Sequence, residues 1–301
     1  MLSRFSFKGH ERALPGLLAG PLLRKLSAIM LLAVLALTIW WPIWFMISGS
    51  VMSMEEITLT IGPAVAGYSG YSVWPIVPSW PTLQPLTNLL LDTPHFFTMF
   101  WNTFRIVVPS VVGQLVIGAP AAWALSRFKF PGRRVVATVY ITLMLMPFQV
   151  SMVPNFLVMD GLGLMGSVWS VVLPFAFSAF PVFIMMRGFD AVPHALLEAA
   201  DIDGAGKFRT FLHVGLPLGV PSILAAMTLG FLDVWGAIEQ PMTFLNDPAS
   251  WPLSLFLPQI VAEELGLAMA ASLLMLMPAA LFFFFGQKYL ELGIQAAGVK
   301  E

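Results

Sequence analysis

Long, charge-free runs of apolar residues alternate with short polar segments along this chain. A helix needs about 20 apolar residues to cross the ~30 Å hydrocarbon core of a bilayer. Six windows of that kind occur in the 301 residues. They cover residues 26–50, about 106–126, 135 to about 159, 167–186, about 216–238 and about 265–286. The pattern predicts an all-α integral membrane protein with six transmembrane helices.

Composition agrees with a membrane protein. Hydrophobic residues make up 58% of the chain and charged residues 10%, with a mean hydropathy of +0.85. An average soluble domain carries about 25% charged residues. The chain has no cysteine, which excludes disulfides and thiolate metal sites. No small-residue cleavage site follows a short apolar core near the N-terminus, so the first window is expected to be a retained span.

The basic residues orient the predicted spans. In membrane proteins, Lys and Arg concentrate in the cytoplasmic segments. With six crossings, 14 of the 15 basic residues fall on one side, and the remaining one is Arg105. The 14 are Arg4, Lys8, Arg12, Arg24, Lys25, Arg127, Lys129, Arg133, Arg134, Arg187, Lys207, Arg209, Lys288 and Lys300. The opposite loops are acidic and contain Glu55, Glu56, Asp92, Asp160, Asp247, Glu263 and Glu264. Both termini are therefore predicted to be cytoplasmic.

The most polar block of the chain covers residues 187–217, between the fourth and fifth windows. Asp190 is a candidate N-cap and Pro193 a first-turn residue of a helix over 194–202. Gly204 is placed to end that helix. A second helix is expected over 207–214, stopped by Gly215 and Pro217. Such a helix pair could dock in a partner's groove or lie on the membrane surface.

This block resembles the EAA signature of the permease subunits of ABC importers. The residues that carry the resemblance are Glu198, Ala199, Ala200, Asp203, Gly204, Ala205, Leu216 and Pro217. The longer form EAADIDGAG is similar to the carbohydrate branch, namely the smaller permease of the maltose importer. The turn AAWALSRFKFPGRR and the C-terminal GQKYLELGIQAAGVKE also resemble that branch.

The resemblance implies a MetI-like ABC importer permease fold in a prokaryotic cytoplasmic membrane. It implies a second permease subunit, two cytoplasmic ATPase subunits, an extracytoplasmic solute-binding protein and a carbohydrate substrate. The EAA loop would insert into a cleft of an ATPase subunit. ATP and Mg²⁺ would bind those ATPase subunits, and this chain would hold no cofactor. No nucleic-acid partner is expected.

The expected organisation follows from the spans and the loop. Residues 1–97 would hold a cytoplasmic N-terminus, the first transmembrane helix and a long extracytoplasmic loop. Residues 98–287 would form the five-helix core with the loop 187–217, and residues 288–301 a cytoplasmic tail.

Polar residues near the end of the fifth window are candidates for the substrate path. An ionisable residue inside a membrane is costly, so Asp233 invites a functional hypothesis. Asp233, Gly236, Ala237 and Gln240 recur at three- and four-residue spacing, which predicts a polar stripe. The candidates are Asp233, Trp235, Glu239, Gln240 and, from the third window, Gln149. Asp233 could contact a sugar, pair with a second permease or Arg105, or relay protons.

The sequence lacks the motifs that the common classes of metal-dependent and nucleotide-binding enzymes require. The four histidines, His10, His95, His194 and His213, are scattered, and neither an HExxH pair nor a GxxxxGK[ST] phosphate loop occurs. Two alternatives to an importer subunit remain open. One is a proton-coupled secondary transporter that uses Asp233 and Glu239, and the other is a membrane scaffold that does not transport.

Overall fold

A computed structural model describes residues 19–65, 71–73, 75–257 and 264–298, and this part of the chain contains helices and loops but no strand. Five of the charged residues that orient the spans lie outside these ranges, namely Arg4, Lys8, Arg12, Glu263 and Lys300.

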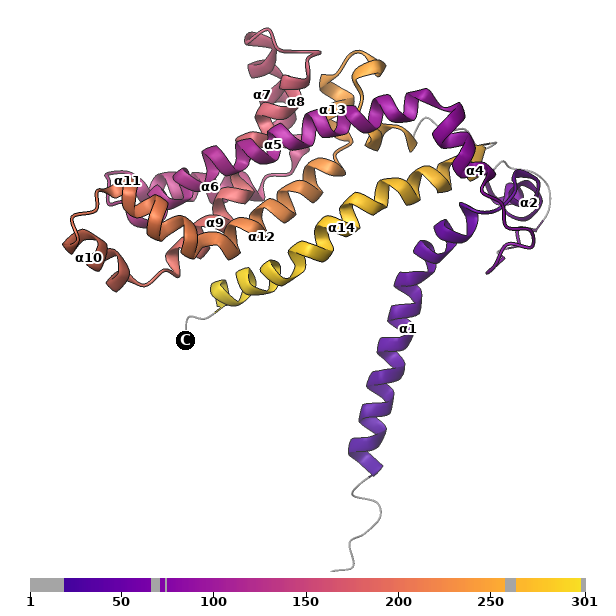
Figure 1. Cartoon of the computed structure of the whole chain (residues 1–301), viewed down its shortest axis with the longest axis horizontal. Helices are drawn as coiled ribbons and strands as arrows, with labels where there is room; N and C mark the ends of the chain where they lie inside the picture. Colours follow the sequence, from indigo (N-terminus) through magenta and orange to yellow (C-terminus); the bar gives the residue numbers. More distant parts are fainter. Residues whose placement is uncertain (1–18, 66–70, 74, 258–263, 299–301) are drawn as a thin grey trace, which may run out of the picture.

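The body of the molecule is a bundle of long apolar helices that lie side by side (Figure 1). It consists of α5 (Pro94–Arg127), α8 (Val168–Ala176), α9 (Ala179–Asp190), α12 (Leu216–Trp235) and α14 (Leu265–Gly298). Helices α5, α9 and α12 contact one another, α8 packs on α5, and α14 packs on α12. Helices α8 and α9 together form one span over Val168–Asp190.

The third predicted window is broken into α6 (Arg133–Leu145) and α7 (Phe148–Gly161), which meet at an angle of 111°. Pro147 lies at the break, where its missing N–H and the preceding residue's restricted backbone end a helix. The broken segment still connects the level of the last turn of α5 with that of the turns after α12. It begins beside the last turn of α5, because Arg133 donates to the Leu125 carbonyl. Beyond it, Gly166 donates to the Phe244 carbonyl, past the far end of α12.

Within the described residues, five helices are long and apolar enough to span a membrane, and there are six candidate spans if the bent pair counts as one. This agrees with the six predicted windows. Pro147 is one of the prolines that lie within or beside the predicted windows, but a hydropathy window reports only apolar length and does not show that the span bends there.

Helix α1 (Ala19–Gly49) stands apart from the bundle along most of its length (Figure 1). Its apolar side chains from Leu23 onward are exposed on all sides, as in a helix surrounded by lipid or by another protein. Only its last turns are anchored. Gly49 approaches Met269 of α14, and the Trp44 indole donates to the Ile76 carbonyl at 2.8 Å.

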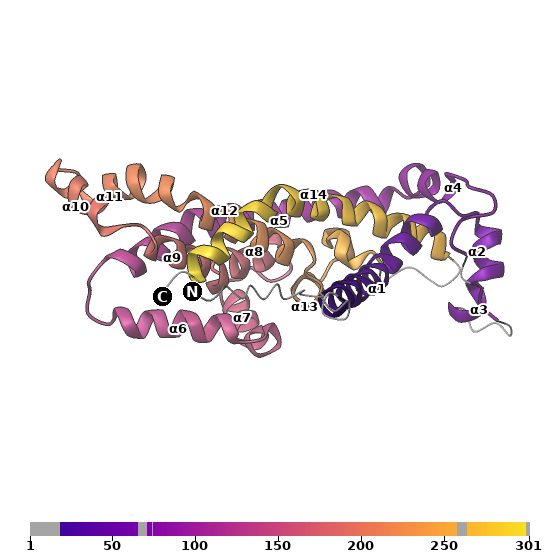
Figure 2. The same ribbon diagram turned by 90° about the horizontal axis from the view of Figure 1, so that it is seen from below.

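The described part of the segment between α1 and α5 combines a helix-free stretch over residues 75–83 with a cap of short helices. These are α2 (Met54–Thr60), α3 (Gly62–Val65), α4 (Gln84–Thr87) and a π-turn (Asn88–Asp92). Ser53 caps α2, and the Glu56 carboxylate accepts the Ser79 N–H at 2.7 Å. A comparable set of short turns follows α12: α13 (Glu239–Phe244), Pro248–Ser250 and Leu253–Leu255. The first set lies at the end of the molecule where α5 begins (Figure 2), and the second set packs beside α5 at Asn102 and Thr103.

Candidate functional site

The polar block forms a projection at one end of the bundle, as Figure 2 shows. It contains α10 (His194–Ile202) and α11 (Lys207–Thr210). The predicted first helix, 194–202, is therefore confirmed. Few side chains of the projection are buried, and none is buried in α10.

A left-handed glycine ends α10. Gly204 has φ +74°, and its N–H donates to the Asp201 carbonyl at 3.1 Å. The Ala205 N–H donates to the Ala200 carbonyl at 2.9 Å. These two bonds form a Schellman motif, which satisfies carbonyls that the helix end would leave open. Lys207 closes the turn with an ion pair to Asp201 at 3.1 Å.

The base of the projection is held firmly in the bundle. The Arg127 guanidinium, in the last turn of α5, donates to the carbonyls of Phe189 and Val192, which flank the end of α9. The indole of Trp123 packs edge-on against Phe189 at 5.3 Å and against Phe211 at 5.8 Å. The projection therefore connects α5, α9 and the segment that leads into α12.

Two local predictions for this block are wrong. Asp190 does not cap α10, because it is the last residue of α9 and its carboxylate accepts from the Ser126 hydroxyl at 2.7 Å. Pro193 occupies the cap position instead, with extended backbone. Gly215 and Pro217 do not stop a helix either. A π-turn over Phe211–Gly215 joins α11 to α12, making one helical run over Lys207–Trp235.

The π-turn has a physical cause in these two residues. Pro217 cannot donate a backbone hydrogen bond, and its ring needs space beside the preceding turn. The wider turn provides that space, and the Leu216 N–H donates to Phe211, five residues back. Gly215 is needed for close packing: a Cβ there would lie 2.7 Å from the Trp123 ring.

Two strongly exposed apolar residues of the projection were not predicted from the sequence. Ile202 is 86% exposed and Phe208 is 73% exposed. Leu196 is also exposed, whereas Leu197 packs against the core. Large apolar side chains concentrated on a projection outside the spans are typical of a docking surface. The signal was present in the sequence as isolated apolar residues within its most polar block.

The remaining EAA residues lie around the same projection. Glu198, Ala199 and Asp203 are exposed, and Ala200 and Ala205 are half-buried against the turn. Leu216 packs on the core, and Pro217 is exposed in the first turn of α12. The residues of the signature thus form the turn after α10, part of the exposed surface of the projection and the connection of the projection to α12.

The substrate-path candidates lie near the opposite end of α12. Asp233 is exposed, and no hydrogen bond or ion pair of its carboxylate is formed within the described residues. It is 17 residues beyond Leu216, which corresponds to about 25 Å along a helix. Asp233 is therefore close to the end of the span that lies away from the projection. Arg105 is exposed and forms no ion pair with it.

Glu239 and Gln149 meet in space although they are far apart in the chain. The Gln149 amide donates to the two Glu239 carboxylate oxygens at 2.7 and 2.8 Å. Gln149 lies in the first turn of α7, just after the bend, and Glu239 begins α13. Both side chains are exposed, so this pair joins the bent span to the turns that follow α12.

Trp235 and Gln240 are buried instead. The Trp235 indole donates to the Met275 carbonyl at 3.1 Å and packs between Phe104 and Phe231. The Gln240 amide donates to the Val171 carbonyl at 3.1 Å. The predicted polar stripe is wrong, because α12 ends at Trp235 and α13 begins only at Glu239. The described residues contain no cluster of three side chains that could hold a metal ion.

The family of binding-protein-dependent transport system inner membrane components matches residues 114–295, more than half of the chain. The matched region contains the projection, its anchors and α12. The chain belongs to this family. It is therefore a multi-pass inner-membrane subunit of a transport system rather than an enzyme.

Relatives of this permease carry sugar-transport names. It is 29% identical to the galactooligosaccharides transport system permease protein GanQ of Bacillus subtilis, over 75% of this chain and 82% of that protein. It is 25% identical to the arabinooligosaccharides transport system permease protein AraQ of Bacillus subtilis, over 92% and 96%. It is 32% identical to the diacetylchitobiose uptake system permease protein NgcG of Streptomyces coelicolor, where the match spans only 52% of each chain.

Solved structures share the fold of the permease. A bacterial ABC transporter involved in the import of the acidic polysaccharide alginate matches with a TM-score of 0.76 and 23% identity, over 95% of this chain and 99% of that chain. The alginate transporter in complex with an alginate pentasaccharide-bound periplasmic protein matches with a TM-score of 0.59 and 14% identity, over 92% and 96%. The expected importer permease fold is confirmed.

Proposed function

We propose that this permease forms the translocation path of an ATP-driven carbohydrate importer together with a second permease subunit. An extracytoplasmic binding protein would deliver the sugar, and two cytoplasmic ATPase subunits would bind ATP and Mg²⁺. The names of GanQ, AraQ and NgcG support a carbohydrate substrate. The solved complex of the alginate transporter with a pentasaccharide-bound periplasmic protein supports delivery by a protein of that kind.

The observation that carries the ATPase-docking proposal is the rigidly anchored projection with its exposed apolar residues. We call the surface formed by Leu196, Ile202 and Phe208 the docking face. An ATPase cleft that closes on ATP binding would move this face. Arg127 and the Trp123, Phe189 and Phe211 rings would transmit that movement to α5, α9 and α12.

Such a transmission has a thermodynamic requirement. The ATPase must bind the projection more tightly in one conformation of the permease than in the other, since a ligand with equal affinity for both shifts no population. A firmly tied projection favours this coupling, because its position depends on the arrangement of the helices that hold it.

The orientation is also part of the proposal. The projection and the α5–α6 turn lie at the same end of the bundle and carry most of the described basic residues, which favours the cytoplasmic side. With six crossings, both termini are cytoplasmic. Asp233, Glu239 and Gln149 then lie toward the outer face, where a sugar from the binding protein would enter. Carboxylate and amide groups there could pair with its hydroxyls.

Purification tests this proposal. A tagged permease extracted from native membranes in mild detergent should retain an ATPase and a second permease. Changing Ile202→Ser together with Phe208→Ser should reduce the recovered ATPase at least tenfold, because the double change removes two exposed apolar anchors from the docking face. The membrane content of the permease should stay unchanged, since neither residue lies in a predicted span.

A matched control is available on the outer cap. Leu59 is 71% exposed and lies at the other end of the molecule, so Leu59→Ser should leave the recovered ATPase unchanged. Recovery of the permease without any ATPase, combined with uptake that persists after ATP depletion, would instead support the proton-coupled transporter that uses Asp233 and Glu239. Normal recovery of partners with no effect of deletion on uptake would support a scaffold.

A further inference from the structure

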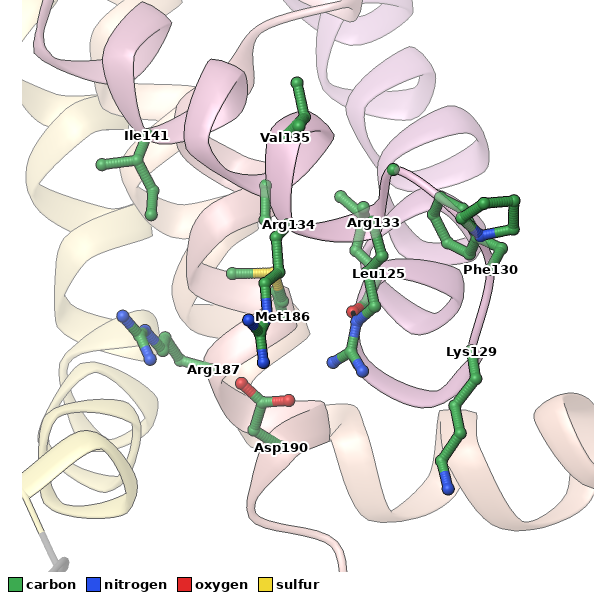
Figure 3. Close-up of a pocket in the computed structure, with 13 residues that line it drawn as sticks. Leu125, Lys129, Phe130, Arg133, Arg134, Val135, Ile141, Met186, Arg187 and Asp190 are labelled. Carbon is green, nitrogen blue, oxygen red and sulfur yellow. Dashed lines mark hydrogen bonds between the residues drawn. The ribbon is translucent and has the colours of Figure 1, made fainter.

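A basic pocket opens where α5 and α9 end and α6 begins (Figure 3). Its volume is about 940 Å³. The guanidinium groups of Arg133 and Arg134 point toward the carboxylate of Asp190, while the side chains of Arg187 and Lys129 extend away from it. The proposed transport role uses neither this pocket nor its cations.

The cations of the pocket are not neutralised by the chain itself. Within the described residues, the single ion pair joins Lys207 and Asp201, so Asp190 forms none with the arginines around it. Asp190 accepts a hydrogen bond from Ser126. The charged residues that line the pocket are Lys129, Arg133, Arg134, Arg187 and Asp190, so the pocket carries an excess of positive charge.

The three arginines have different roles. Arg133 is occupied, because it donates to the carbonyls of Leu125 and Ser126 at 2.6 and 2.9 Å. Arg187 lies over the Phe183 ring at 4.9 Å and keeps its N–H groups open. Arg134 has no hydrogen-bond partner among the described residues. Arg134 and Arg187 are therefore available to an anion, and the guanidinium fork suits a phosphate.

One wall of the pocket is apolar and continues into the membrane-spanning part of α6. Leu125, Val135, Ile141 and Met186 line it. Val135, Val139 and Leu143 are spaced four residues apart on α6, are exposed, and form an apolar track. The track begins next to Arg134 and follows the helix away from the charged end. Cations at the head of an apolar track match the amphipathic shape of a phospholipid.

We propose that this pocket binds the phosphate of an anionic phospholipid, with Arg134 and Arg187 holding the headgroup and the α6 track contacting an acyl chain. That the lipid lies in the cytoplasmic leaflet rests on the proposed orientation, whereas the binding of the lipid to the pocket does not depend on that orientation. A free phosphate offers the same charge but would leave the apolar track uncovered. Basic pockets between spans are known to recognise such headgroups.

Native mass spectrometry of the full-length permease, purified with its co-eluting subunits, tests this site. The probes are phosphatidylglycerol and phosphatidylcholine. The permease should retain phosphatidylglycerol in preference to phosphatidylcholine. Arg134→Gln together with Arg187→Gln should weaken that binding about 25-fold, on the basis of about fivefold for each basic residue near the headgroup. Arg134→Lys together with Arg187→Lys should preserve most of the phosphatidylglycerol binding.

Two further variants distinguish a loss of the site from a general change of charge and from misfolding. Lys25→Gln with Lys288→Gln removes the same charge from exposed positions outside the pocket and should change the affinity less than twofold. Asp190→Asn removes the one carboxylate that would repel a phosphate and should strengthen the binding several-fold. A gain for phosphatidylglycerol with unchanged retention of phosphatidylcholine would identify the headgroup charge as its cause, because a damaged fold would not distinguish the two lipids.

Three results would overturn the proposal. Equal retention of the two lipids would exclude recognition of the anionic headgroup. Displacement of phosphatidylglycerol by millimolar inorganic phosphate would indicate a soluble anion as the ligand. Loss of the ATPase, with lipid retention unchanged, in the Arg134→Gln and Arg187→Gln variant would make the pocket a protein interface.

Discussion

Single residues decide the shape of the docking projection, and Gly204 is the clearest example. Its φ of +74° lies in the left-handed region, which costs an ordinary residue about 1–2 kcal/mol. A Cβ at Gly204 would meet no atom of the described residues within 4 Å. The glycine is thus required by the backbone, and the space beside it is open for a partner. The sequence predicted this role because a glycine after a helix is itself a local signal.

Substitutions of Gly204 can distinguish a constraint imposed by its backbone conformation from a constraint imposed by the partner's surface. Asparagine tolerates the left-handed region, whereas a β-branched valine does not. We expect Gly204→Asn to keep at least half of ATP-driven uptake and Gly204→Val to lose most of it, at equal amounts of permease in the membrane. Uptake assays in membrane vesicles measure this. An equal loss in both variants would place the constraint in the partner's cleft, and normal uptake in both would contradict the coupling role.

Asp233 supports a second prediction at this scale. Its carboxylate is exposed and unpaired within the described part of the chain, so Asp233→Asn should not affect the bundle. We expect reduced uptake, with the complex recovered in normal amount. A higher KM for the sugar would indicate contact with the substrate. Disappearance of the complex would show that Asp233 pairs with another subunit instead.

Elements were predicted well wherever local sequence determines them. The six windows, the 194–202 helix and its terminal glycine are all determined by apolar length or by end signals. The π-turn, the bend before α7 and the burial of Trp235 are not. The bend and the π-turn arise at Pro147 and Pro217, and a hydropathy window does not report either of them. The close packing of Gly215 on Trp123 and the bond from the Trp235 indole to Met275 depend on tertiary contacts. The meeting of Gln149 with Glu239 likewise requires the bend, which hydropathy does not report.

The π-turn yields a prediction about α11 and α12. Pro217→Ala restores an N–H and removes the ring, which allows the run from Lys207 to become regular α-helix. The α11 segment would then turn by about 100° relative to α12, because one residue of a helix covers that angle. We expect the docking face to be misdirected, so that the uptake per ATP hydrolysed falls several-fold.

Pro221→Ala provides the control, since Pro221 lies in the same helix beyond the π-turn. It should change the ratio of uptake to ATP hydrolysis less than twofold. The ratio is measured in proteoliposomes that contain the purified complex. Equal effects of the two substitutions would show that loss of a proline, and not the shape of the π-turn, determines the outcome.

At the scale of the whole molecule, the two ends of the bundle have opposite roles in the proposed transport cycle. One end carries the docking projection and the basic pocket, and the other carries the outer cap, Asp233 and the pair formed by Gln149 and Glu239. The candidate spans and the proposed orientation could be predicted from the sequence, because hydropathy and charge are properties of the residues summed along the chain. The partners do not, since the exposed helix α1 and the docking face show only that something covers them.

Site-specific crosslinking can show whether the projection docks on an ATPase subunit. The chain has no cysteine, so Ile202→Cys introduces its only thiol, and Leu59→Cys is the matched control on the outer cap. In native membranes, a thiol-reactive crosslinker should join position 202 to an ATPase subunit, in an amount that changes when ATP is added, and should not join position 59 to it. An ATPase joined to position 59 and not to position 202 would contradict both the docking role and the proposed orientation.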